Sequence, residues 1–221
     1  MALDILPLGD SALVVRTADS LADVLKTADK LRAASIAGVE EIVPAFASVG
    51  IFFQSGRDLV DATEAIRAAL RRRSLGRLSA QRPRVVEIPV CYEDEFALDL
   101  SEVAQHCGLQ RDDVVKRHAA GRYQVRCVGF TPGFPYLAGL PKQLVMPRRR
   151  TPRTSVVPGS VAIGGRQTGI YPLASPGGWN IIGRTPLRLF DPAREPAALL
   201  RAGDRVCFVA ITAKQFAQWR A

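Results

Sequence analysis

GFTPGFPYL, residues 129–137, opens the stretch that decides the fold of most of this 221-residue chain. Three aromatic side chains alternate there with glycines and prolines. Proline fixes φ and glycine permits positive φ, so we expect a loop held in one shape. Such a loop forms either the wall of a pocket or a plug that closes the end of a barrel, and both interpretations remain open for Phe130 and Phe134.

Downstream, glycine and proline recur every few residues as far as Pro192. Short apolar segments lie between them, at residues 160–163, 179–182, 187–190 and, further on, 205–209, and another precedes them at 124–129. Many short apolar segments separated by turn residues are typical of a barrel or a sandwich. Two short helices, residues 101–107 and 111–119, are expected just before this β-rich part.

The first 84 residues have a different pattern. Apolar residues predict strands at 5–8 and 12–16 and two more between 39 and 54, while helical spacing predicts helices at 20–34 and 58–73. The polar, basic segment 74–84 has no clear periodicity. We therefore expect an α+β chain with two domains: residues 1–84, a ferredoxin-like α/β sandwich, and residues 85–221, the β-rich domain.

Charge is distributed unevenly over the chain, which has a formal net charge of +9. No Asp or Glu occurs between Asp113 and Asp191, although 12 Lys and Arg residues lie in that window. A basic segment without carboxylates favours binding of an anionic partner. Alternatively, any single arginine of this segment could simply be part of a solvated, arginine-rich surface.

The arginines are most dense in PRRRTPRT, residues 147–154. Flanking prolines restrict this run, and each guanidinium offers a planar fork of donors that suits carboxylate or phosphate. We predict that Arg148 and Arg153 contact an anion. Non-specific binding to a nucleic-acid backbone is the competing interpretation of such a basic run.

Paired glycines follow in GGRQTGIYP, residues 164–172, and SPGGWN, residues 175–180. Glycine lets backbone N–H groups approach a ligand, and neutral hydrogen-bonding side chains stand beside these glycines. Those side chains are Gln167, Tyr171, Ser175 and Asn180. The pattern suits a small polar ligand, and it matches no phosphate-loop or dinucleotide-binding motif.

General bases are scarce near these motifs. His118 is the only ordinary candidate, and a structural role for it is about as strong an interpretation as catalysis. Any carboxylates of a site would come from Asp191 onwards or from another subunit. The four cysteines are scattered without a CxxC pair, so we predict no metal site. No apolar run approaches the length of a membrane span and no export signal is visible, so we expect a cytoplasmic protein.

Four motifs together resemble the family of 5-oxoprolinase B subunits, also described as allophanate hydrolase subunit 1 or as carboxyltransferase subunit domains. They are GFTPGFPYLAGLP, PRRRTPRT, GSVAIGGRQTGIYP and SPGGWNIIGRTPLRLFDP, in this order along the chain. The resemblance implies an N-terminal ferredoxin-like domain and a C-terminal cyclophilin-like β-barrel. The chain departs from the family pattern at Pro158, which is shifted by one place, and at residues 97–98, where Gly-Pro is expected.

The resemblance also implies an activity, namely ATP-dependent opening of 5-oxo-L-proline to L-glutamate together with separate A and C subunits. ATP would be shared with those subunits, and no nucleic acid or membrane would be involved. Carried over to this sequence, the catalytic residues are His118, Arg148 and Arg153, and the substrate-binding residues are Gln167, Tyr171, Ser175, Gly177, Gly178 and Trp179. Two other functions stay open: inhibition of a sensor histidine kinase, and allophanate hydrolysis or urea carboxyl transfer.

Overall fold

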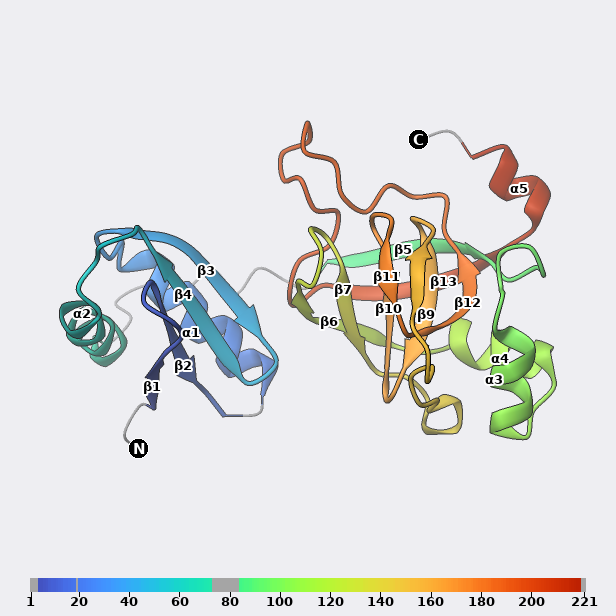
Figure 1. Ribbon diagram of the computed structural model, residues 1–221, viewed down its shortest axis with the longest axis horizontal. Helices are drawn as coiled ribbons and strands as arrows, with labels where there is room; N and C mark the ends of the chain where they lie inside the picture. The colour runs from blue at the N-terminus through green and yellow to red at the C-terminus, as the bar shows by residue number, and fades with distance from the viewer. Residues whose placement is uncertain (1–3, 19, 73–83, 220–221) are drawn as a thin grey trace. The chain divides into compact units, whose positions relative to one another are not determined.

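The computed structural model describes residues 4–18, 20–72 and 84–219. Internal contacts divide the chain into two compact units, residues 1–82 and 83–221. Figure 1 shows both, the first in blue to teal and the second in green to red. Most of the polar segment 74–84 that we interpret as the linker lies outside the described residues.

The first unit is one antiparallel sheet with two helices packed on one face (Figure 1). Its strands, in sheet order, are β1 (Ile5–Pro7), β2 (Ala12–Arg16), β4 (Ser48–Phe53) and β3 (Val39–Ala45); its helices are α1 (Leu21–Ala33) and α2 (Leu59–Arg71). Alternate strand residues such as Leu13, Val15 and Ile51 face the helices and form the core. The predicted strands and helices of this unit are confirmed, with small shifts at their ends.

Helix starts follow the expected capping chemistry. The Ser20 hydroxyl accepts a hydrogen bond from the Asp23 backbone N–H at 3.0 Å, and the Asp58 carboxylate accepts one from Val60 at 2.7 Å. In a ferredoxin-like βαββαβ fold, the edge strand of the sheet at this position follows the second helix. Here the edge strand next to β2 is β1, which precedes β2 in a hairpin. The ferredoxin-like expectation is therefore not confirmed.

The second unit contains a closed barrel, so the barrel is confirmed in preference to a sandwich. In order around the barrel, the strands are β10 (Gln167–Ile170), β7 (Pro135–Ala138), β6 (Tyr123–Val128), β13 (Arg205–Ile211), β5 (Val85–Cys91), β12 (Asn180–Arg184) and β9 (Ser160–Gly164). Strands β5 and β13 pair in parallel over their whole length, whereas the other neighbours pair antiparallel.

Smaller elements surround the barrel. They are α3 (Leu100–Cys107), α4 (Arg111–Ala119), the 3-10 turn η1 (Lys142–Leu144), α5 (Ala213–Ala217), and a two-stranded sheet of β8 (Arg153–Val156) and β11 (Ser175–Gly177). Helix α3 ends at Gly108 in the left-handed conformation, as glycine permits. The apolar segment 187–190 does not form a strand, because only Phe190 makes an isolated bridge, to Ala198. No helix in the described part of the chain has the length and apolarity to cross a bilayer.

Strands β9 and β12 are buried on both faces. Val161, Ile163 and Ile182 point into the barrel core, while the neighbouring residues Ala162 and Ile181 belong to a separate aromatic cluster on the outer face. A strand that is buried on both sides reads as a continuous apolar run, as these do. The outer cluster is where the sequence motifs converge.

His118 lies inside the barrel core with no exposed surface. Its Nδ1 is 2.8 Å from the Tyr92 hydroxyl, its Nε2 is 3.1 Å from the Thr168 hydroxyl, and its ring stacks on Phe208. Burial lowers the pKa of His118 to about 3 because the charged imidazolium is poorly solvated there. The imidazole is therefore neutral at physiological pH and serves as a hydrogen-bonded part of the core.

The buried histidine predicts a pH-dependent stability. The unfolded chain takes up a proton near pH 6.5 while the folded chain does not, so the free energy of unfolding is highest above pH 6.5 and falls as the pH drops toward 3. Between pH 6.5 and 5 this one group removes about 2 kcal/mol. When the free energy of unfolding is measured with denaturant across this pH range, the His118→Gln variant should not show this decrease.

His106→Gln is the matched control, because His106 is exposed at the end of α3. Its stability profile should follow that of the unaltered chain. Parallel profiles for His118→Gln and the unaltered chain would contradict the assignment of a neutral histidine to the core.

Candidate functional site

The arginine segment, residues 147–153, is fixed by one buried carboxylate. Asp99 precedes α3 and is only 1% exposed. Its carboxylate accepts hydrogen bonds from two arginines of this segment. Arg149 Nη1 donates to Oδ1 at 2.7 Å, and Arg153 donates through Nη2 to Oδ1 at 2.7 Å and through Nη1 to Oδ2 at 2.9 Å. Arg153 thus makes a bidentate ion pair, the geometry that gives the strongest guanidinium–carboxylate contacts.

Asp99 is itself fastened to β12. The Ile181 backbone N–H donates to Asp99 Oδ2 at 2.7 Å, and the Asp99 N–H donates to the Ile181 carbonyl at 2.8 Å. The carboxylate therefore accepts four hydrogen bonds. A buried charge is tolerated only when it is paired and fully hydrogen-bonded in this way.

Residues 178–181 hold the arginine segment at successive points. The Gly178 carbonyl accepts the Arg149 backbone N–H at 2.7 Å, the Asn180 side chain donates to the Pro147 carbonyl at 2.8 Å, and Ile181 acts through Asp99. We call these contacts, together with the Asp99 ion pairs, the arginine clasp. Its anchor is the start of a barrel strand, so the segment is a rigid extension of the barrel.

Arg148 is left with a different environment. Its guanidinium carbon lies 5.9 Å from the centre of the Trp179 ring, within the range of a cation–π contact. Among the described residues it has no carboxylate partner. The exposed Arg148 side chain therefore remains available to an external anion, as does that of Arg150, which also has no carboxylate partner among the described residues.

Beneath Arg148 lies the aromatic cluster on the outer face of the barrel. Phe134 contacts four rings edge to face, with centroid distances of 4.9 Å to Tyr136, 5.2 Å to Tyr171, 5.6 Å to Trp179 and 5.7 Å to the exposed Phe130. Gly164 and Gly177 make room for these rings, because a Cβ at Gly164 would meet Trp179 and one at Gly177 would meet Tyr171. In this structure the two glycines serve aromatic packing.

Two tyrosine hydroxyls of the cluster are electrostatically coupled to Arg148. Burial raises the pKa of Tyr136 and of Tyr171, and the positive charge of Arg148 opposes part of each rise. For Tyr171, a hydrogen bond with the Trp179 backbone lowers the pKa as well. Both hydroxyls are therefore neutral at physiological pH, and the Tyr171 side chain is almost wholly buried.

The structure brings most of the predicted site residues together. Arg148, Arg153, Tyr171, Gly177, Gly178 and Trp179 belong to the clasp or the aromatic cluster. Gln167 pairs with Gly164, the glycine that the Trp179 ring covers. Ser175 lies on β11, and its hydroxyl is buried without a hydrogen-bond partner in the described part of the chain. Their role in binding substrate stays a prediction.

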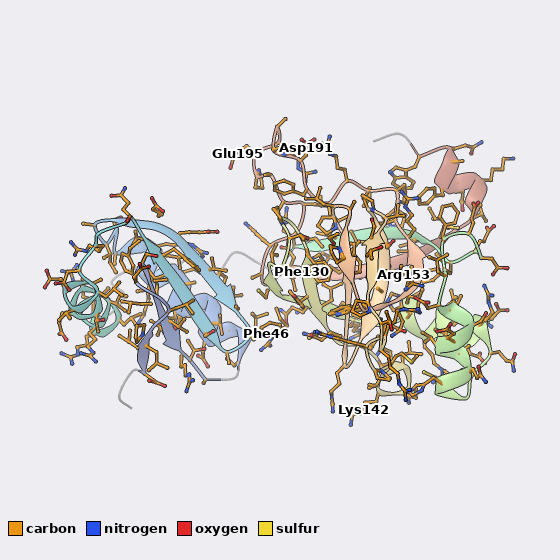
Figure 2. All side chains as sticks on the ribbon, in the orientation of Figure 1. Phe46, Phe130, Lys142, Arg153, Asp191 and Glu195 are labelled. Carbon is orange, nitrogen blue, oxygen red and sulfur yellow. The ribbon has the colours of Figure 1, made fainter. Side chains whose placement is uncertain are left out.

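Other predicted residues lie elsewhere. His118 is inside the barrel, so its catalytic role stays a prediction that its burial does not support. Phe134 is buried in the outer cluster, whereas Phe130 is 64% exposed with φ of 73°, and Figure 2 shows it well apart from Arg153. Phe134 therefore packs against the outside of the barrel instead of plugging its end.

Sequence reasoning missed Asp99. The carboxylate of the site precedes the carboxylate-free window, whereas we expected it from Asp191 onwards or from another subunit. The available signal was an aspartate between apolar neighbours in FALDL, residues 96–100, since a charge within an apolar segment indicates a buried partner. In the described residues no group of His, Cys, Asp or Glu could hold a metal, and burial raises the pKa of the Cys91, Cys107 and Cys127 thiols.

The clasp predicts that neighbouring arginines differ in their effect on stability. Arg153→Ala leaves a buried carboxylate short of a partner and should lower the free energy of unfolding by about 3 kcal/mol. Arg148→Ala removes an exposed side chain and should change it by less than about 1 kcal/mol. Denaturant unfolding of both variants measures the difference, and equal losses would show that Arg153 is not held by Asp99.

Comparison with known proteins identifies the family. The family model for the carboxyltransferase domain, subdomain C and D, matches residues 3–200. The B subunit of the Bacillus subtilis 5-oxoprolinase is 39% identical over 95% of this chain and 93% of its own length.

Solved structures extend the comparison. The crystal structure of TTHA0988 is 36% identical over 91% of this chain, with a TM-score of 0.76, and this chain spans 40% of that one. The urea carboxylase of Kluyveromyces lactis shares the fold at 19% identity, with a TM-score of 0.73, over 98% of this chain and 22% of that one. The barrel, the aromatic cluster and the matches over nearly the full length lead to one conclusion: this chain belongs to the family of 5-oxoprolinase B subunits, which are carboxyltransferase-domain proteins.

Proposed function

We propose that this chain is a non-autonomous subunit of a cytoplasmic 5-oxoprolinase, which uses ATP to open 5-oxo-L-proline to L-glutamate together with A and C subunits. The name of the Bacillus subtilis relative, which is similar over nearly its whole length, supports this proposal. So does the site, which offers the exposed guanidinium of Arg148 to a small anionic amide.

The proposed reaction has three steps, and residues of this chain would bind the substrate. ATP transfers its γ-phosphoryl group to the lactam oxygen, water adds to the activated carbon, and the C–N bond breaks to give glutamate, ADP and phosphate. Arg148 would hold the substrate carboxylate beside the Trp179 ring. Fixed donors of this kind lower the barrier by positioning the substrate and stabilising charge.

One observation carries the non-autonomous role. Hydrolysis needs a positioned base, yet at this site the Asp99 carboxylate is fully occupied by four hydrogen bonds. His118 is sealed in the barrel core and neutral. The exposed carboxylate of Glu102 is paired with Arg149 at 3.7 Å, so we infer that a partner subunit supplies the base. Kinase inhibition and allophanate or urea chemistry rest on the family resemblance alone.

Reconstitution tests this function. The purified chain should release no glutamate from 5-oxo-L-proline and ATP, and the mixture with both partner subunits should release it. In that mixture Arg148→Ala should slow turnover at least tenfold, a loss of about 1.4 kcal/mol, because the carboxylate contact is gone.

Arg150→Ala is the matched control, because Arg150 is an exposed neighbour in the same segment. Its turnover should stay within about twofold of the unaltered complex, a difference below about 0.5 kcal/mol. A complete complex that releases no glutamate would rule out the proposed activity. Equal rates for Arg148→Ala and the unaltered complex would remove Arg148 from the site.

A further inference from the structure

We propose that Asp99 is a specificity-determining residue that makes this site selective for a monoanion, such as a carboxylate, over a polyphosphate. The inference rests on the proposed function in that 5-oxo-L-proline is a monoanion. It goes further by assigning the selectivity to the charge of one buried residue that does not itself touch the substrate.

The first support is the balance of charges at the clasp. Three guanidinium groups, those of Arg148, Arg149 and Arg153, face two carboxylates, Asp99 and Glu102. Glu102 lies 3.7 Å from Arg149 Nη1. Among the described residues Arg148 and Arg150 therefore keep a charge without a carboxylate partner, and that of Arg148 lies over the Trp179 ring.

The second support is the use of hydrogen-bond donors. Arg153 commits both terminal nitrogens to Asp99, and Arg149 commits Nη1 to the same carboxylate. Tight binding of a polyphosphate requires several cations whose donors point outward. Here the internal carboxylate occupies the whole fork of Arg153 and one terminal nitrogen of Arg149, which leaves fewer donors for further phosphates.

The third support is burial. Because Asp99 is almost wholly excluded from solvent, its charge is screened far less than that of an exposed residue. Removing that charge would leave Arg149 and Arg153 largely uncompensated next to Arg148. Arg150 is exposed and has no ion pair with Asp99, so its charge does not depend on that carboxylate.

A consequence concerns ATP. If the arginine segment binds one carboxylate, it does not bind the triphosphate of the nucleotide. The phosphates of ATP would then be held outside the clasp, and the arginine-rich sequence that resembles a phosphate site would serve the other substrate.

Trp179 provides a direct reporter of binding at Arg148. The chain has two tryptophans, and Trp219 lies in the exposed C-terminal segment, so Trp219→Phe leaves Trp179 as the single emitter. The full-length chain in this background is titrated with 5-oxo-L-proline and, separately, with inorganic tripolyphosphate at fixed ionic strength. We expect a saturable response to 5-oxo-L-proline and an affinity for tripolyphosphate at least tenfold weaker.

Charge substitutions then test the role of Asp99. Asp99→Asn should shift the ratio of the two affinities at least tenfold toward tripolyphosphate. The double variant Asp99→Asn/Arg153→Gln, in which the charge balance is restored, should return the ratio to that of the unaltered chain. A merely structural role for Asp99 would not produce this recovery, because the double variant restores charge without rebuilding the ion pair.

A milder variant covers the case in which Asp99→Asn does not fold. Glu102→Gln changes an exposed carboxylate and should shift the ratio in the same direction by about twofold. The inference is overturned if 5-oxo-L-proline gives no Trp179 response, or if every folded charge variant keeps the original ratio. Glutamate release by the full complex is measured separately, so a failure of the proposed activity is distinguishable from a failure of the selectivity.

Discussion

A buried carboxylate that binds two guanidinium groups organises this part of the protein. Removing ions from water costs several kcal/mol each, and the cost is offset only where geometry and hydrogen bonding are nearly complete. Asp99 meets this condition with donors from Arg149, Arg153 and the Ile181 backbone. Because its partners come from distant segments, the carboxylate joins the loop before α3, the arginine segment and β12 into one unit.

The barrel gives the clasp its rigidity. Residues on β12 alternate between the barrel core, which contains Ile182, and the outer cluster, which contains Ile181 and extends to Trp179. The same short stretch therefore closes the barrel, supports the aromatic rings and anchors the arginines. Arg148 is placed over Trp179 by this framework, and the charges of Arg149 and Arg153 are balanced by Asp99 and Glu102.

Local rules explain what the sequence predicted well. Helical and alternating periodicity depends on near neighbours, and the structure confirms the helices that it predicted, with Ser20 and Asp58 as the caps of α1 and α2. The short helix α5 was missed, and residues 187–190 were mistaken for a regular strand, because short apolar pieces carry little periodic information.

Long-range pairing explains what the sequence could not predict. Arg148 and Arg153 are chemically alike, and only the position of Asp99, about fifty residues earlier in the chain, distinguishes the free guanidinium from the paired one. The glycines of the motifs were expected to let backbone N–H groups approach a ligand. In the structure, Gly164 and Gly177 instead make room for aromatic rings. His118 had two interpretations of equal weight, and its position within the closed barrel supports the structural one.

The most direct test of this account is a pair of double-mutant cycles on the free energy of unfolding. One cycle combines Asp99→Asn with Arg153→Gln, and the other combines Asp99→Asn with Arg148→Gln. The account predicts a coupling energy of about 2 kcal/mol or more in the first cycle and one within about 0.5 kcal/mol of zero in the second. Similar coupling energies in both cycles would contradict the division of the arginines into paired and free.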